Sequence, residues 1–174
     1  MQEDGVTADQ VVACCFRVPP LTARLIGRPA IEGMTPGYAR LCLQYVGAVC
    51  LRCGTVGLDD FIAAALADPA TLALARRLSV ADNGHRDPNA LAPQNVEIDL
   101  ADGRTVTRVV NAVLGSPDRP LSAEAARAKF DVCWRSAPEL SPGQGAALWD
   151  TISTFEALDD IRILPTLLGP QGAG

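Results

Sequence analysis

The segment between Thr35 and Gly54 constrains the fold most, because it carries the start and stop signals of one long helix. Thr35 offers a side-chain oxygen as an N-cap, and Pro36 suits the first helical position, where its missing N–H is not needed. Gly54 follows the apolar stretch and supplies the C-terminal stop. The side chains in between are apolar nearly all round. The pattern therefore predicts a helix over residues 36–53 that is buried on most faces.

Strand patterns lie on both sides of this helix. Residues 11–18 are rich in β-branched and apolar side chains and end at two prolines, as expected for a buried strand. Residues 96–110 alternate apolar and polar side chains around Asp102-Gly103, a pair that favours a tight turn. This pattern predicts a β-hairpin with one solvated face, and residues 79–81 are a candidate for a further strand.

Capping residues and prolines mark further helices. Because strands and helices are grouped without a strict βαβ rhythm, the predicted class is α+β. We expect a small mixed or antiparallel sheet, its hairpin packed against several helices, followed by C-terminal helices. The additional predicted helices cover residues 21–26, 61–66, 70–78, 123–134, 146–157 and 158–168.

Composition excludes several classes of function. The net charge is -5, the sequence pI is about 4.8, and basic residues occur singly, so no stripe of positive charge could follow nucleic acid. The chain has no apolar run of about 18 residues and no signal-peptide order at its start, which predicts a cytoplasmic protein without membrane contact. The six cysteines lie mostly in apolar segments, so we expect reduced thiols in the core.

Several segments resemble one family in order and spacing. Residues 33–45, Gly-Met-Thr-Pro-Gly-Tyr-Ala-Arg-Leu-Cys-Leu-Gln-Tyr, are similar to the lid-domain helix of MmgE/PrpD proteins. Residues 101–104, Ala-Asp-Gly-Arg, resemble the hairpin turn of that lid. The loop at residues 115–122, the Lys129-Phe130 helix and the end at residues 158–168 continue the resemblance, which covers roughly residues 8–168.

This resemblance implies a division of the chain. Residues 8–128 would form the α+β lid domain, and residues 129–168 would be helices that return to a large helical domain. Residues 1–7 and 169–174 would be frayed ends. The large domain, on the same or a separate chain, is therefore the expected partner, and the 174 residues would be a fragment or a naturally truncated chain.

The resemblance also implies a chemistry. Family members such as 2-methylcitrate dehydratase, cis-aconitate decarboxylase and iminodisuccinate epimerase act on small polycarboxylates without a cofactor. Their acid and base groups come mostly from the large domain, so no catalytic residue is expected here. With one histidine and one lysine, the chain cannot rebuild that acid/base set, and we expect it to be inactive alone.

Three residues are candidates for contact with substrate. Arg40 would be either a structural ion-pair partner or a receptor for a carboxylate, and Arg28 in the preceding loop is a second local cation. An acidic domain repels an anion at long range, so a polycarboxylate site needs such cations. Tyr45 would either line the cleft, as the resemblance implies, or be a core aromatic whose hydroxyl has one partner.

Other reactive side chains favour structural interpretations. Cys50 and Cys53 form a CxxC that closes a predicted helix, where the dipole raises a thiol pKa, and no second pair completes a zinc site. We therefore predict buried structural thiols and no metal. His85 is predicted to be a solvated loop histidine. Asp99 and Asp102 are neighbours only in sequence, without any sign of a shared proton.

Two functions remain open at this stage. The first is a lid that closes over a polycarboxylate held by the large domain and excludes water. The second is a stand-alone module for self-association, including a homodimer, or for binding another chain. An exposed apolar face would serve either function.

Overall fold

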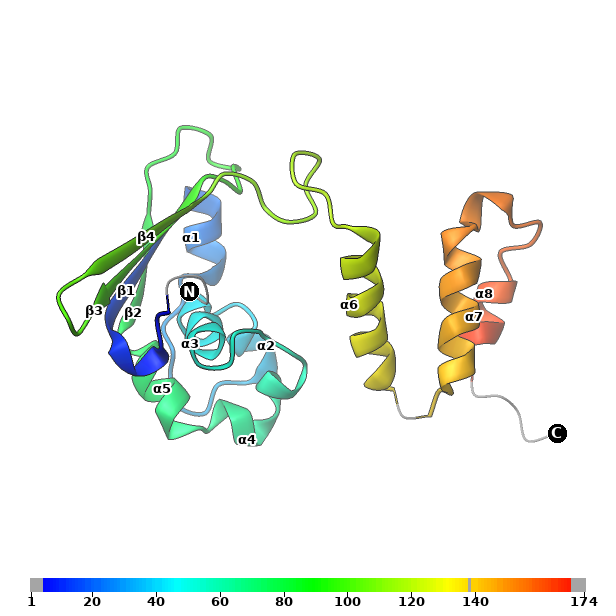
Figure 1. Cartoon of the computed structure of the whole chain (residues 1–174), viewed down its shortest axis with the longest axis horizontal. Helices are drawn as coiled ribbons and strands as arrows, with labels where there is room; N and C mark the ends of the chain where they lie inside the picture. Colours follow the sequence, from blue (N-terminus) through cyan, green and yellow to red (C-terminus); the bar gives the residue numbers. More distant parts are fainter. Residues whose placement is uncertain (1–4, 138, 170–174) are drawn as a thin grey trace. The chain divides into compact units, whose positions relative to one another are not determined.

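The computed structural model describes residues 5–137 and 139–169, and the chain divides into two compact units between Arg119 and Pro120. The first unit combines a sheet with helices, and the second consists of helices (Figure 1). The predicted α+β class is confirmed. The predicted boundary between residues 128 and 129 falls inside helix α6 (Ala123–Arg135) of the second unit.

The first unit contains a four-stranded mixed sheet in the order β2-β1-β3-β4. Strand β1 (Val11–Val18) is central, parallel to β2 (Leu78–Asp82) and antiparallel to β3 (Gln94–Leu100). Strand β4 (Thr105–Val110) forms a hairpin with β3. The predicted strands at residues 11–18 and 79–81 and the predicted hairpin are therefore confirmed.

The core lies on one face of this sheet. Cys14 is opposite Leu78 on one side and Ile98 on the other, and all three side chains are buried. Helix α3 (Leu43–Cys53) packs directly on this face at Gly47, where an added Cβ would lie 2.7 Å from the Phe16 ring and 2.9 Å from Leu78. Only glycine allows this approach without displacement of the neighbours.

The predicted helix over residues 36–53 is wrong in its continuity. It is divided into α2 (Pro36–Ala39) and α3 (Leu43–Cys53), because Cys42 is extended, with φ −110° and ψ 96°. Cys42 makes an isolated β-bridge with Gly27, and its Sγ donates to the Arg28 carbonyl oxygen at 3.2 Å. This tertiary pairing interrupts the helix at Cys42. No glycine or proline in the local sequence predicts the interruption.

The predicted ends of that segment are confirmed. The Thr35 hydroxyl accepts a hydrogen bond from the Tyr38 N–H, and Gly54 ends α3 in the left-handed region at φ 76°. The remaining elements of this unit are short. They are the 3-10 turns η1 (Ala8–Gln10) and η2 (Asp59–Phe61) and the helices α1 (Pro20–Ile26), α4 (Ala63–Leu66) and α5 (Pro69–Ala75).

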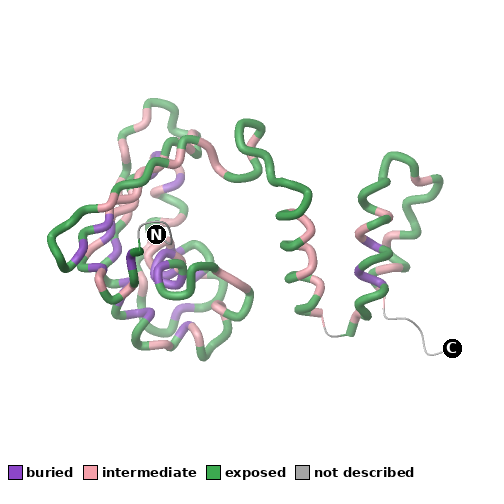
Figure 2. The backbone as a smooth tube through the Cα atoms, in the orientation of Figure 1, coloured by how far each residue is buried: buried purple, intermediate pink, exposed green. Residues whose placement is uncertain are grey.

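The second unit contains α6, α7 (Pro142–Ser153), the 3-10 turn η3 (Phe155–Ala157) and α8 (Ile163–Leu168). The predicted helix over residues 146–157 is wrong at both ends, because a capping box between Ser141 and Gln144 starts α7 at Pro142 and the helix ends at Ser153. Among the described residues of this unit, only Gln144, Gly145 and Leu148 are buried. Figure 2 shows the contrast with the buried interior of the first unit.

The ends of the chain agree only partly with the predicted frayed segments. Residues 1–4 and 170–174 lie outside the described residues. Val6, however, is 8% exposed and belongs to the core cluster around the sheet, so the prediction of fraying is wrong at this position. Within the described residues, no helix combines the length and the apolar character needed to cross a membrane.

Candidate functional site

Arg28 lies in the loop that leads into α2, with its guanidinium 5.0 Å from the centre of the Tyr38 ring. The Tyr38 hydroxyl donates to the Pro29 carbonyl oxygen at 2.8 Å, which ties the ring back to the same loop. Tyr38 also packs against the buried cluster around Ala39 and Tyr45. The arginine therefore has a fixed aromatic platform next to the core.

Arg40 has an equivalent platform on a different element. It follows α2 directly, and its guanidinium lies 5.5 Å from the centre of the Phe61 ring at the end of η2. Phe61 packs against the same buried cluster as Tyr38. Both cations are thus stacked on rings that the same cluster supports, and such stacking orients a guanidinium without neutralising its charge.

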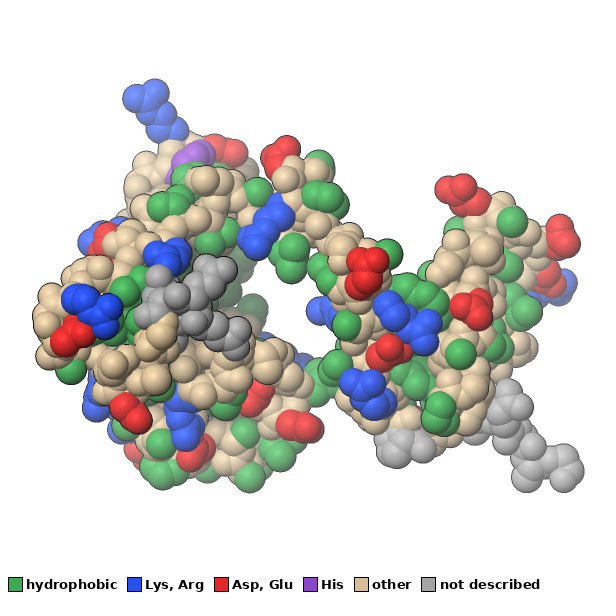
Figure 3. Space-filling model, viewed as in Figure 1, with side chains coloured by type: hydrophobic (Ala, Val, Ile, Leu, Met, Phe, Trp, Pro, Cys, Tyr) green, Lys and Arg blue, Asp and Glu red, His purple; other side chains and the backbone are tan. Residues whose placement is uncertain are grey.

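Arg28 and Arg40 combine an aromatic contact with the absence of an acidic partner among the described residues. Within the part of the chain that the structure describes, neither Arg28 nor Arg40 forms an ion pair, and Arg40 is exposed. Arg127 also lies over an aromatic ring, but Asp131 pairs with it at 2.9 Å. The predicted alternative of Arg40 as an ion-pair partner therefore finds no partner among the described residues. Basic and acidic side chains are interspersed on the face that Figure 3 shows.

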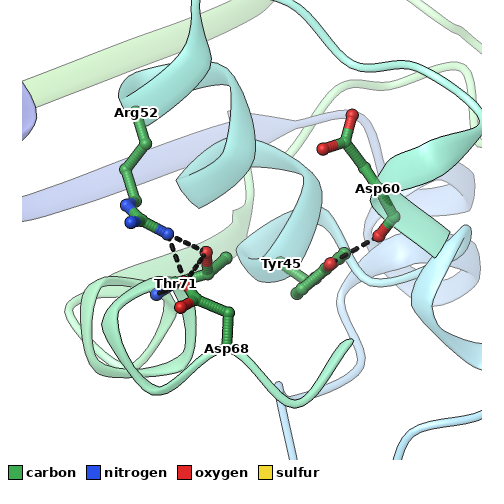
Figure 4. A network of polar contacts seen from close by, with 5 residues as sticks. All are labelled: Tyr45, Arg52, Asp60, Asp68 and Thr71. Atoms are coloured by element: carbon green, nitrogen blue, oxygen red, sulfur yellow. Dashed lines mark hydrogen bonds and ion pairs between the residues drawn. The ribbon is translucent and has the colours of Figure 1, made fainter. Parts of the chain in front are cut away.

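Tyr45 is a core residue with a satisfied hydroxyl. Its side chain is 1% exposed, and its hydroxyl donates to the Asp60 carbonyl oxygen at 2.5 Å (Figure 4). Its ring contacts Phe61 at a centroid distance of 6.2 Å. Burial, followed by the nearby Asp60 and Asp68 carboxylates, raises the pKa of Tyr45. A neutral, engaged phenol suits the positioning of Phe61 better than proton transfer.

Gln44 holds the Arg28 loop against the sheet. Its side-chain carbonyl accepts from the Ala30 N–H at 2.7 Å, and its amide donates to the Leu78 carbonyl oxygen at 2.7 Å. One side chain thus forms hydrogen bonds with a backbone N–H of the loop and with the first carbonyl oxygen of edge strand β2. The break at Cys42 places Arg40 at the end of α2 and Gln44 at the start of α3.

A second polar network clamps the end of α3 to the start of α5 (Figure 4). Arg52 donates to the Asp68 carboxylate and to the Thr71 hydroxyl. Asp68 is the N-cap of α5 and accepts from the Thr71 N–H at 2.8 Å. Hydrogen bonds from the Thr71 side chain and N–H, followed by Arg52, lower the pKa of Asp68 to about 2. This network is structural, since every charged group in it has a partner.

The cysteines correct one prediction. All six are free, but only Cys14 and Cys42 are buried, so the expectation of core thiols is wrong for Cys50, Cys53 and Cys133, which are exposed. The reason for Cys50 and Cys53 is their position on the last turn of α3, on the side that turns away from the buried residues Val49 and Leu51. Burial raises the pKa of the Cys14 thiol to about 12.

The remaining candidates do not assemble a proton-transfer site. His85 is half-buried in a loop, where Nδ1 accepts from the Asp87 N–H at 3.1 Å. Asp99 accepts from the Thr105 hydroxyl and Asp102 pairs with Arg104, so the two carboxylates have separate partners. Among residues 5–137 and 139–169, no group of histidine, cysteine and acidic side chains could hold a metal ion.

Arg28 and Arg40 are therefore the candidates for contact with an anion among the described residues. Sequence reasoning named Arg28, Arg40 and Tyr45 but missed the role of Phe61, the ring that contacts two of them. Phe61 is far from both in the sequence, and no local pattern indicates a cation–π contact. Tyr38, in contrast, stands inside the motif at residues 33–45 and could have been identified there.

Two comparisons bear on the chain as a whole. A model of the MmgE/PrpD C-terminal domain matches residues 1–144. The chain is also similar to a protein of Mycolicibacterium smegmatis (strain MKD8) named "Putative ESX-1 scaffolding and assembly protein SaeB", with 31% identity over 145 residues. The match covers 79% of this chain but 16% of that protein, so the chain spans a small part of its relative.

Proposed function

This chain belongs to the MmgE/PrpD family and carries its C-terminal domain, and on this premise we propose that it is the closing domain of a lyase or isomerase that acts on a small polycarboxylate. The groups that move protons belong to the large helical domain, on the same or a separate chain. The 174 residues alone are then incomplete as a catalyst, and no cofactor enters the proposal.

One observation carries this proposal, namely the state of Arg28 and Arg40. Each guanidinium lies over an aromatic ring and has no carboxylate partner among the described residues. A guanidinium matches a carboxylate in charge and in the planar geometry of its donors. Each guanidinium therefore suits one carboxylate of a ligand. Because the net charge is -5, a site for a polycarboxylate needs local cations such as these.

In this proposal the domain positions the substrate and does not transfer protons. Arg28 and Arg40 orient the carboxylates, while Tyr45, through Phe61, fixes the platform under Arg40. Closure over a substrate on the large domain removes water, which strengthens each charged contact. The substrate is then held from two sides, and the proton transfer occurs on the side away from this domain.

The test is a titration of the ¹⁵N-labelled chain with the tricarboxylate citrate, followed by NMR. We expect shifts at the Arg28 and Arg40 side chains and at the backbone of Tyr38 and Phe61. Arg40→Ala should weaken binding about 10- to 100-fold, the usual effect of losing a hydrogen bond between charged groups. Arg76→Ala is the matched control, because Glu32 already pairs with that exposed arginine. Equal binding by the Arg40 and Arg76 variants would refute the assignment.

A second candidate is an interaction module that takes part in assembly. It is supported by the similarity to the scaffolding and assembly protein of M. smegmatis and by the apolar side chains that the second unit exposes. Light scattering at rising concentration separates the two functions. A stable oligomer whose formation is unaffected by Arg28→Ala and Arg40→Ala, together with no citrate binding, would favour the module.

A further inference from the structure

Cys50 and Cys53 lie one helical turn apart at the end of α3, and the proposed function uses neither of them. Both are exposed, and both are free thiols. The backbone of this turn is still α-helical, because the Gly54 N–H donates to the Cys50 carbonyl oxygen at 2.9 Å. The pair is therefore accessible from solvent and held in a defined geometry.

The geometry is close to that of a disulfide. In an α-helix, Cα atoms three residues apart are about 5 Å from each other, within the range of roughly 4.4–6.8 Å that disulfides span. The Cβ atoms of such a pair are about 5–6 Å apart, whereas a disulfide needs about 3.5–4.5 Å. The last turn must therefore distort so that the two Cβ atoms approach each other by about 1–2 Å.

Distortion of this turn has a defined consequence. It weakens the hydrogen bond from Gly54 to Cys50, and Gly54 begins the segment that leads to η2. Within η2, the Asp60 carbonyl accepts from Tyr45, and Phe61 lies under Arg40. The two thiols are thus joined by a short stretch of backbone to the platform of one candidate substrate arginine.

We propose that Cys50 and Cys53 are a redox modification site, at which a reversible disulfide loosens residues 54–61 and with them the platform of Arg40. The disulfide itself stands on the geometry of α3 alone. Its effect on substrate binding rests on the proposed function of Arg40. The remaining cysteines lack an equivalent arrangement, since Cys14 and Cys42 are buried, Cys15 is half-buried in strand β1, and Cys133 is in the second unit.

The reaction is thiol–disulfide exchange with a small disulfide such as oxidised glutathione. One cysteine thiolate attacks a glutathione sulfur, forms a mixed disulfide and releases one glutathione thiolate. The second cysteine thiolate then attacks the protein sulfur of the mixed disulfide, forms the Cys50–Cys53 bond and releases the second glutathione. Two protein thiols are oxidised, one glutathione disulfide is reduced, and the two thiol protons pass to solvent or to the released thiolates.

The rate of this exchange should rise with pH, because the thiolate is the attacking species. Desolvation by the surrounding protein atoms, followed by the neighbouring Asp60 and Cys53, raises the pKa of Cys50. Attack by Cys50 is therefore expected to be slow at neutral pH and faster in alkaline buffer. This behaviour distinguishes it from a catalytic thiol activated at a helix N-terminus.

Peptide mapping provides the test, because trypsin cuts after Arg52, between the two cysteines. The full chain is equilibrated in glutathione mixtures from reduced to oxidised, alkylated and digested. We expect peptides 41–52 and 53–76 to be joined in oxidised samples. The link should be lost in Cys50→Ser and kept in Cys42→Ala. Absence of the link at every mixture, or its persistence in Cys50→Ser, would overturn the proposal.

Hydrogen exchange then tests the consequence. Amides of residues 54–61 should exchange about fivefold faster in the oxidised chain, the effect of losing one helix hydrogen bond. The double variant Cys50→Ser with Cys53→Ser, treated identically, should show no change. Equal exchange in the linked and reduced chains would refute the coupling to Arg40. Citrate binding by the reduced chain is measured separately, so failure of the proposed function is distinguishable from failure of the disulfide.

Discussion

The helices of the two units differ in how far their side chains are buried. In the first unit, helices cover one face of a four-stranded sheet and share with it a continuous buried cluster. In the second, α6 buries no residue fully, and only Gln144, Gly145 and Leu148 of the described residues are buried. Large apolar side chains remain exposed there, namely Leu121, Val132, Ile152, Phe155, Ile161, Ile163 and Leu168.

This difference indicates which unit can stand alone. A unit of about 50 residues has little core to offset the entropy of folding. The first unit has a core of ordinary size, whereas the second presents an apolar surface that another surface can cover. A partner domain would therefore contribute more to the stability of the second unit than to that of the first.

The largest expected effect is on the core of the first unit. Leu78→Ala removes a side chain that is 2% exposed between α3 and the sheet, and should cost about 2–5 kcal/mol of its unfolding free energy. Leu148→Ala, at 4% exposure in the second unit, should cost at most about 2 kcal/mol, because a loosely packed site collapses around the missing atoms.

Urea unfolding separates the two substitutions. Both tryptophans of the chain, Trp134 and Trp149, are in the second unit, so their fluorescence reports on that unit, and circular dichroism reports on both. Fluorescence should change at lower urea than the final loss of dichroism. Leu148→Ala should shift the first transition and Leu78→Ala the second. A single shared transition that moves in both variants would show that the units unfold as one body.

A smaller effect is expected from pH, again on the first unit. The folded pKa of Asp68, about 2, lies below its ordinary value of 3.8, so its ionised form stabilises the folded state. This contribution is complete above about pH 4 and is lost as the pH falls toward about 2. The second dichroism transition should therefore move to lower urea over this interval.

Asp68→Asn is the matched variant, because asparagine also caps a helix but does not titrate in this range. It should flatten the pH dependence of the second transition between about pH 4 and pH 2. The fluorescence transition should keep its own pH dependence, because the charged groups of the second unit are unchanged. An unchanged slope for the second transition in the variant would remove Asp68 as its cause.

Much of the fold can be predicted from local sequence patterns. The strand over residues 11–18, the hairpin around Asp102-Gly103 and the caps at Thr35 and Gly54 all depend on neighbours within a few residues, and all are confirmed. The break at Cys42 was not readable, because its cause is a bridge to Gly27, fifteen residues earlier in the sequence. Pairing across such a distance overrides helix propensity.

The sequence predicts the residues of the candidate site but not their contacts. Arg40 has no carboxylate partner among the described residues, Arg28 faces Tyr38, and Tyr45 is buried with a satisfied hydroxyl. The aromatic platform at Phe61 depends on η2, a segment whose position relative to α2 is set by tertiary packing. The exposure of Cys50 was missed because an apolar segment indicates burial only on average.

The most direct measurement of the central claim is turnover in the presence and absence of the large helical domain of the family. Small polycarboxylates are offered to the chain alone, to the large domain alone and to the mixture, with Arg40→Ala in parallel. The account predicts no dehydration, decarboxylation or epimerisation by the chain alone, turnover by the mixture, and a loss of activity in Arg40→Ala that exceeds its loss of stability. Robust turnover by the 174 residues alone would contradict it.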